Sequence, residues 1–204
     1  MSFTNPPLNG SDIKKRLHGR TRVLLYEELA KYNNIDELLD PYGNCFILMR
    51  SKPQFGHWVC LKKWPEAKVV SFFDSYGDFP DDQKQHINQE FLVSSGQEYN
   101  NLCRLLHGAS FKYTVEFSQY QLQSKDKKTA TCGQWCCLFV EYNGPGVDGF
   151  YQYITSLGQP DLDQVCLQLF YDEGRPNKRI TVNYPLSASL SKFCCSLQLE
   201  NFKI

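Results

Sequence analysis

The chain has 204 residues, equal numbers of acidic and basic residues, and a composition that is 42% hydrophobic and 22% charged. This length suits one domain with a sizeable core, and the composition excludes an intrinsically disordered chain. No stretch approaches the roughly 18 apolar residues of a membrane span, and the first residues lack the pattern of a signal peptide.

The nine cysteines do not form the pattern of a secreted disulfide framework, because their number is odd and two adjacent pairs occur, Cys136-Cys137 and Cys194-Cys195. We therefore expect mostly buried thiols in a chain that stays in a reducing cytosol. Cys132 lies close to the first pair, but no second Cys or His pair completes a tetrahedral zinc site. Neither a metal nor another cofactor is expected.

The first part of the chain predicts two short helices and then an antiparallel meander. Ser11 or Asp12 could cap a helix within 11–29, and a second short helix is expected at 35–39, before Pro41. Three apolar or alternating runs, separated by turn residues, predict strands at 45–50, 57–63 and 69–73.

The elements expected next are a helix at 80–92, a helical turn at 101–106, a strand at 111–123, a polar loop at 124–129, a buried central helix at 132–140 and an amphipathic helix at 161–170. We expect residues 1–173 to form the main domain. The extension 174–204 carries too many apolar residues for a free linker, so we expect it to pack on that domain as edge strands or a short helix.

Cys132 is the candidate nucleophile. It follows a polar loop and opens an apolar run, so its side chain would lie at a helix N-terminus, where the dipole favours a thiolate. Gly133 would then let a substrate backbone approach closely. A lone cysteine is more often a small buried hydrophobe, so the interpretation depends on partners.

The base must be one of four histidines: His18, His57, His86 and His107. His57 begins a predicted strand, whereas His86 lies on a polar helix face and His18 among exposed basic residues, so His57 is the preferred base. Asp74 ends the adjacent predicted strand and is placed to orient the imidazole.

The order of these residues resembles that of a known family, the adenovirus protease and the SUMO-specific proteases. The motifs are Gly56-His57-Trp58, Phe73-Asp74-Ser75-Tyr76-Gly77, Gln121-Leu122-Gln123 and Thr131-Cys132-Gly133. In papain the cysteine precedes the histidine instead. The resemblance spans roughly 43–142 and implies an α+β fold, in which a central helix carrying Cys132 packs on a mixed, mainly antiparallel sheet flanked by helices.

The resemblance also implies roles for two further residues. A glutamine before the cysteine would donate to the oxyanion; Gln123 is preferred because it is nearest, although Gln119 and Gln121 share its predicted strand face. Trp58 would roof a tunnel that admits glycine beside the scissile bond. No tryptophan precedes Trp58 to complete this clamp, and Tyr42 or Phe55 are the candidates to replace it.

The function implied is a monomeric cysteine endopeptidase that processes viral capsid or core precursors in the host cytoplasm or virion, with a protein substrate and no membrane partner. Two alternatives remain open: a deconjugating isopeptidase for ubiquitin-like modifiers, and a catalytically inactive binding scaffold. An activating peptide or nucleic acid is a less favoured partner, because charge runs are usually solvated faces. The basic cluster in question comprises Lys14, Lys15, Arg16, His18, Arg20 and Arg22.

Overall fold

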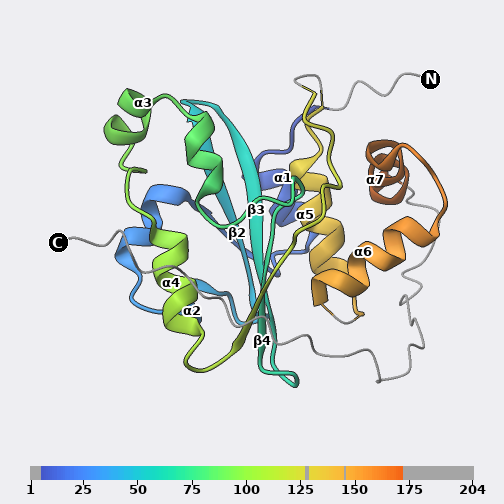
Figure 1. Cartoon of the computed structure of the whole chain (residues 1–204), viewed down its shortest axis with the longest axis horizontal. Helices are drawn as coiled ribbons and strands as arrows, with labels where there is room; N and C mark the ends of the chain where they lie inside the picture. Colours follow the sequence, from blue (N-terminus) through green and yellow to red (C-terminus); the bar gives the residue numbers. More distant parts are fainter. Residues whose placement is uncertain (1–5, 127–128, 145, 172–204) are drawn as a thin grey trace.

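A five-stranded sheet forms the middle layer of the computed structural model, which describes residues 6–126, 129–144 and 146–171 (Figure 1). Its strands, in spatial order, are β1 (Arg22–Leu25), β2 (Asn44–Lys52), β3 (Phe55–Trp64), β4 (Val69–Phe73) and β5 (Thr114–Phe117). The three central strands pair antiparallel, while β1 and β5 run parallel to their neighbours. The predicted α+β class and the antiparallel meander are therefore confirmed.

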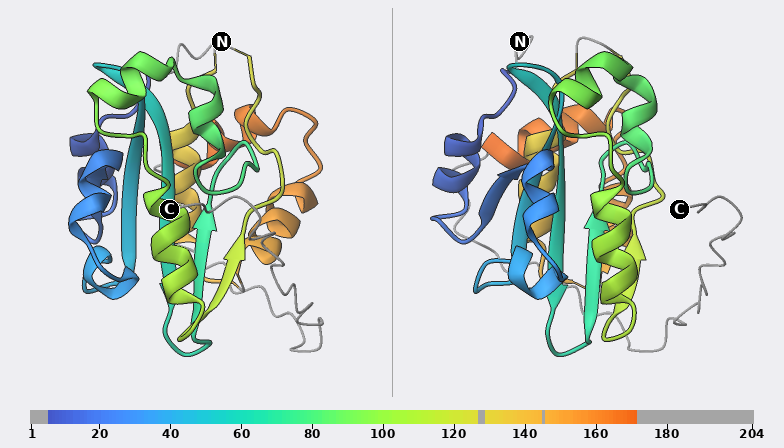
Figure 2. Two further views of the ribbon diagram at one scale, coloured as in Figure 1. Left: turned by 60° about the vertical axis from the view of Figure 1, so that its left-hand side comes forward. Right: turned by 90° about the vertical axis from the view of Figure 1, so that its left-hand side faces the viewer.

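Helices cover both faces of this sheet (Figures 1 and 2). One face carries α1 (Gly10–Arg16), α5 (Cys132–Glu141), α6 (Gly146–Ser156) and α7 (Leu162–Tyr171). The other carries α2 (Ile35–Leu38), α4 (Asn101–Ala109) and the 3₁₀ helix η1 (Tyr26–Lys31), with η2 (Asp82–His86) and α3 (Gln89–Ser94) in the connection that leads to α4.

The strand β2 is apolar on both faces because each face is covered by helices. Cys45, Ile47 and Met49 pack with the α2 and α4 layer, and Phe46 packs with the α5 layer. This division follows from the alternation of side chains along a strand. A nearly continuous apolar run is the pattern expected for a strand buried on both sides.

The helix α5 is the buried centre of its layer, as predicted for 132–140. Its first six residues are buried, and Phe139 stacks on Phe73 of β4 with ring centroids 4.6 Å apart. Phe150 of α6 meets Phe139 edge to face at 5.4 Å. A helix that is apolar nearly all round lies in a core, so α5 holds Cys132 on a rigid support.

Lys62 of β3 secures the other end of α5. Its buried ammonium group donates to the backbone carbonyl oxygens of Val140, at 3.0 Å, and of Tyr142. The last carbonyls of a helix lack intrahelical partners and carry partial negative charge, so a cation is favourable there. Burial nevertheless lowers the pKa of Lys62 to about 7.

Several predicted elements differ from the structure. The helix expected at 80–92 is divided into η2 and α3, because Asp81 adopts a left-handed conformation (φ 70°) and Ile87 is extended. The strand expected at 111–123 is limited to β5. The region 11–29 contains α1, β1 and part of η1, and Asn9, rather than Ser11 or Asp12, caps α1. The expectations for 174–204 lie outside the described residues.

Candidate active site

His57 and Asp74 come together because β3 and β4 are antiparallel neighbours. Cys60 pairs with Phe73 in this register, so His57 and Asp74 lie toward the same end of the two strands. The His57 Nε2 atom lies 2.8 Å from Asp74 Oδ1, and the Asp74 side chain is fully buried. The Asp74 backbone N–H donates to Ser118 Oγ at 2.8 Å, which fixes the start of the turn that follows β4.

Cys132 completes the arrangement from the N-terminal end of α5. Its thiol lies close enough to the His57 side chain to raise the pKa of that ring. Since Nε2 faces Asp74, the ring nitrogen left for the thiol is Nδ1. The structure thus brings Asp74, His57 and Cys132 together, with the imidazole near both the carboxylate and the thiol, the set of groups that nucleophilic catalysis by a cysteine uses.

The charge of His57 is set by its two partners. Burial by itself would lower the pKa of His57, but the Asp74 carboxylate and the Cys132 thiol together raise it to about 10. Because this pKa lies above the ordinary value of about 6.5, the contribution of His57 to folding stability is present below about pH 6.5 and is lost as the pH rises toward 10. An imidazolium that persists at neutral pH favours a neighbouring thiolate.

We expect the His57 ring to keep its extra proton to about pH 10 in the wild-type protein, and to lose it at lower pH in the Asp74→Asn variant. The variant removes the carboxylate charge that opposes the effect of burial. An NMR titration of ring-labelled histidines measures both values, and the exposed His18, His86 and His107 serve as internal comparisons. Titration of wild-type His57 near pH 6.5, or an unchanged value in the variant, contradicts this account.

Gln123 is the buried member of the three candidate glutamines, and Gln119 and Gln121 are exposed. The Ser75 hydroxyl donates to Gln123 Oε1 at 2.8 Å, which orients the amide. Among the described residues, Gln123 Nε2 makes only long contacts, 3.3 Å to the Tyr76 hydroxyl and 3.4 Å to the Thr129 carbonyl. The shared strand face predicted for these glutamines is wrong, because β5 ends at Phe117.

Ser75 and Tyr76 are site residues to which the sequence analysis assigned no role. The Ser75 carbonyl accepts hydrogen bonds from the backbone N–H groups of Leu122 and Gln123, both at 2.9 Å. The Tyr76 ring stacks on His57 with centroids 4.6 Å apart, and its backbone N–H donates to Asp74 Oδ1 at 2.8 Å. The turn after β4 therefore fixes both Asp74 and Gln123. The position of Ser75 and Tyr76 between Asp74 and Gly77 was the sequence feature that could have indicated their role.

The expected substrate contacts, Trp58 and Gly133, lie against the chain's own N-terminal segment. The Trp58 indole N–H donates to the Leu8 carbonyl at 2.9 Å. A Cβ added to Gly133 would lie 3.0 Å from Leu8 Cβ and 3.3 Å from Trp58. Gly133 therefore allows the close approach of Leu8 and Trp58, and a direct role of either residue in substrate binding stays a prediction.

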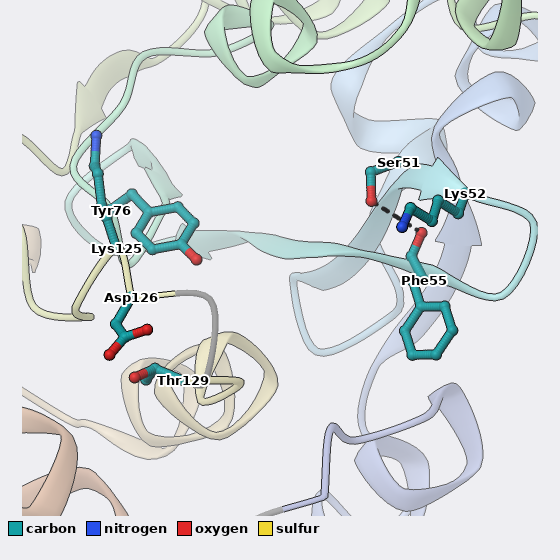
Figure 3. A pocket seen from close by; sticks show the side chains of 7 residues that line it. All are labelled: Ser51, Lys52, Phe55, Tyr76, Lys125, Asp126 and Thr129. Carbon is teal, nitrogen blue, oxygen red and sulfur yellow. Dashed lines mark hydrogen bonds between the residues drawn. The ribbon is translucent and has the colours of Figure 1, made fainter.

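A pocket of about 460 Å³ opens beside Tyr76 (Figure 3). One wall belongs to the β2–β3 hairpin, and the other to Tyr76 of the turn after β4 and to the segment that precedes α5, with the Phe55 and Tyr76 side chains on opposite sides. The lining residues are Ser51, Lys52, Phe55, Tyr76, Lys125, Asp126 and Thr129. Tyr76, which lines this pocket, stacks on His57, so the pocket lies next to the candidate active site.

The remaining described cysteines are buried or partly buried. Cys45, Cys60, Cys136, Cys137 and Cys166 are buried, and Cys103 is partly buried. Burial raises the pKa of the Cys136, Cys137 and Cys166 thiols well above the ordinary value.

Within the described residues, no group of His, Cys, Asp or Glu side chains could hold a metal ion. No helix in the same part of the chain is long and apolar enough to cross a membrane.

Comparisons with known proteins relate the chain to a virophage protein. No family model matches it. The structure of ChlaDub1 from Chlamydia trachomatis is similar at 16% identity and a TM-score of 0.25, covering 60% of this chain and 51% of ChlaDub1; a similarity this low carries no argument. Protein V9 of Sputnik virophage, which is uncharacterised, is 32% identical over 150 residues, covering 74% of this chain and 84% of V9. The chain therefore belongs to the family of the Sputnik virophage protein V9.

Proposed function

We propose that this protein is a cysteine endopeptidase in which Cys132 is the nucleophile, His57 the base and Asp74 the residue that orients His57. The observation that carries this proposal is the hydrogen bond between the Asp74 carboxylate and the His57 ring, with the Cys132 thiol close to that ring at the start of a buried helix. Mutually supporting roles of this kind argue for catalysis more strongly than any single residue does.

The proposed reaction proceeds in two steps. The Cys132 thiolate attacks the scissile carbonyl, and the Cys132 backbone N–H and Gln123 Nε2 donate to the oxyanion that forms. The His57 imidazolium then gives its proton to the leaving amine, so that the C–N bond breaks and a thioester remains. His57 next takes a proton from water, and the water oxygen attacks the thioester. The C–S bond breaks, the acid product leaves, and the Cys132 thiolate and the His57 imidazolium are restored.

The proposed substrates are viral capsid or core precursors, cleaved at glycine-containing sites during virion maturation. The relationship to a virophage protein supports a viral setting. The pocket between Phe55 and Tyr76 is the proposed entrance for an extended segment of the substrate, because Tyr76, one of its lining residues, stacks on His57. A glycine preference rests on the resemblance of the His57-Trp58 motif to that of the adenovirus and SUMO-specific proteases.

Incubation with the proteins of the same virus, followed by mass spectrometry of new N-termini, tests this proposal. We expect new termini to follow glycine-containing sequences in a few capsid or core proteins. The Cys132→Ala variant, treated in parallel, identifies cleavages made by other proteases. Cleavage only at isopeptide bonds of modified lysines would show that the protein is a deconjugase and not an endopeptidase. Identical termini with the wild-type protein and the Cys132→Ala variant would favour the catalytically inactive binding scaffold.

A further inference from the structure

Asp163 of α7 contacts residues next to both Gln123 and Cys132, although nothing in the sequence around Asp163 suggested a role. Its Oδ2 atom accepts a hydrogen bond from the Ser124 backbone N–H at 2.8 Å. Its Oδ1 atom accepts from the Thr131 hydroxyl at 2.5 Å and from the Trp135 indole N–H at 3.4 Å. One half-buried carboxylate therefore joins three points that are separate along the chain.

Two of the three contacts involve residues directly adjacent in sequence to Gln123 and Cys132. Ser124 directly follows Gln123, and Thr131 directly precedes Cys132, so the Asp163 carboxylate ties together the two ends of the connection between these residues. Trp135 lies one helical turn after Thr131 in α5 and is fully buried. The third contact thus attaches the carboxylate to the rigid helix that carries Cys132.

The shorter hydrogen bonds of Gln123 come from a different element. Its side chain and backbone are held by Ser75, which belongs to the turn after β4, and its contact with the Thr129 carbonyl is long, at 3.4 Å. Those bonds fix the position of Gln123 relative to Asp74 and His57, but not relative to α5. Within the described residues, the contacts of Asp163 fix the position of the glutamine relative to the N-terminal end of α5.

We propose that Asp163 is a positioning residue that sets the distance between the Gln123 amide and the Cys132 thiol. The inference rests on the proposed function, in which both groups act on the same tetrahedral intermediate. An oxyanion donor contributes only when it lies within hydrogen-bond reach of the oxygen on which charge develops, and a displacement of about 1 Å can cost roughly 100-fold in rate. Asp163 touches no reacting atom and acts through the residues that it ties together.

A purely structural role is the competing explanation, because the same carboxylate also fastens α7 to α5. Asp161 provides a matched control. It is exposed, lies two positions earlier, and its Oδ1 accepts from the Gln164 backbone N–H at 3.1 Å, so it caps the same helix without contact to Ser124 or Thr131. Loss of that cap costs stability alone, on the order of 1 kcal/mol.

The experiment measures hydrolysis of N-acetylglycine p-nitrophenyl ester by the full chain. For Asp163→Ala we expect kcat to fall roughly 10- to 100-fold with little change in KM, because the substrate still binds but the oxyanion donor is displaced. For Asp161→Ala we expect wild-type kcat. Asp163→Asn should retain part of the rate, since an amide can accept from the Ser124 N–H and donate to the Thr131 hydroxyl.

The decisive comparison places Asp163→Ala in a Gln123→Ala background. If Asp163 acts through Gln123, the second substitution adds little once the amide is gone, so the two effects are far from additive. Equal losses in both backgrounds, or an Asp163→Ala variant with wild-type kcat, would overturn the inference. A wild-type protein whose rate does not exceed that of Cys132→Ala would instead overturn the proposed function.

Discussion

The Cys132→Ala and His57→Ala variants are expected to hydrolyse N-acetylglycine p-nitrophenyl ester at the background rate, a loss of about 10⁴-fold or more, whereas Asp74→Asn retains measurable turnover. The first two substitutions remove the atoms that form and transfer bonds. The third leaves both His57 and Cys132 in place and removes only the charge that orients and stabilises the imidazolium. Steady-state kinetics on the three purified variants gives the ranking.

Alkylation by iodoacetamide separates loss of chemistry from loss of the fold. At neutral pH we expect Cys132 to react faster than the other thiols in the wild-type protein, and more slowly in His57→Ala, because the imidazolium no longer favours the thiolate. Unfolding would instead expose several buried cysteines together. Faster labelling of Cys60, Cys103 or Cys194, or full turnover by His57→Ala, would refute the assigned roles.

The Gln123→Ala variant is expected to lose about 10²–10³ in kcat with little change in KM, the usual cost of removing one oxyanion donor. Gln121→Ala and Gln119→Ala serve as controls, because both side chains are exposed while Gln123 is buried and held by Ser75. We expect both controls to keep a rate close to that of the wild type.

Iodoacetamide again provides an independent readout for this glutamine. Alkylation forms no oxyanion, so Gln123→Ala should label at Cys132 as fast as the wild-type protein while its ester hydrolysis is slow. A large loss of kcat in Gln121→Ala alone would transfer the role to that residue. Slow labelling of Gln123→Ala would indicate that the amide supports the thiolate rather than the oxyanion.

The sequence was sufficient to predict the elements whose periodicity reflects burial. The central strands and α5 are long apolar runs covered on both sides, so local pattern and tertiary environment agree. The segment 80–92 shows where this fails, because Asp81 accepts hydrogen bonds from the distant Tyr26 hydroxyl and the Cys103 backbone N–H. Those partners, more than twenty residues away, favour a left-handed conformation that helical periodicity does not reveal.

For the candidate site, the spacing of motifs predicted which side chains meet but not what holds them. His57 and Asp74 lie on consecutive strands, so an antiparallel pairing is enough to bring them together. Asp163 gives no such signal, since its three partners are 39, 32 and 28 positions away and reach it only when α7 packs beside α5. Contacts of this kind depend on helix packing, which a single sequence does not specify.

The contact of Leu8 with Trp58 and Gly133 has a practical consequence for how the protein is produced. Leu8 lies beside Gly133, the residue after Cys132, so a group attached shortly before Leu8 is held near the thiol. We expect an affinity tag placed there to compete with added substrates for access to Cys132. A tag at the opposite terminus, or one removed before assay, gives rates that report the enzyme alone.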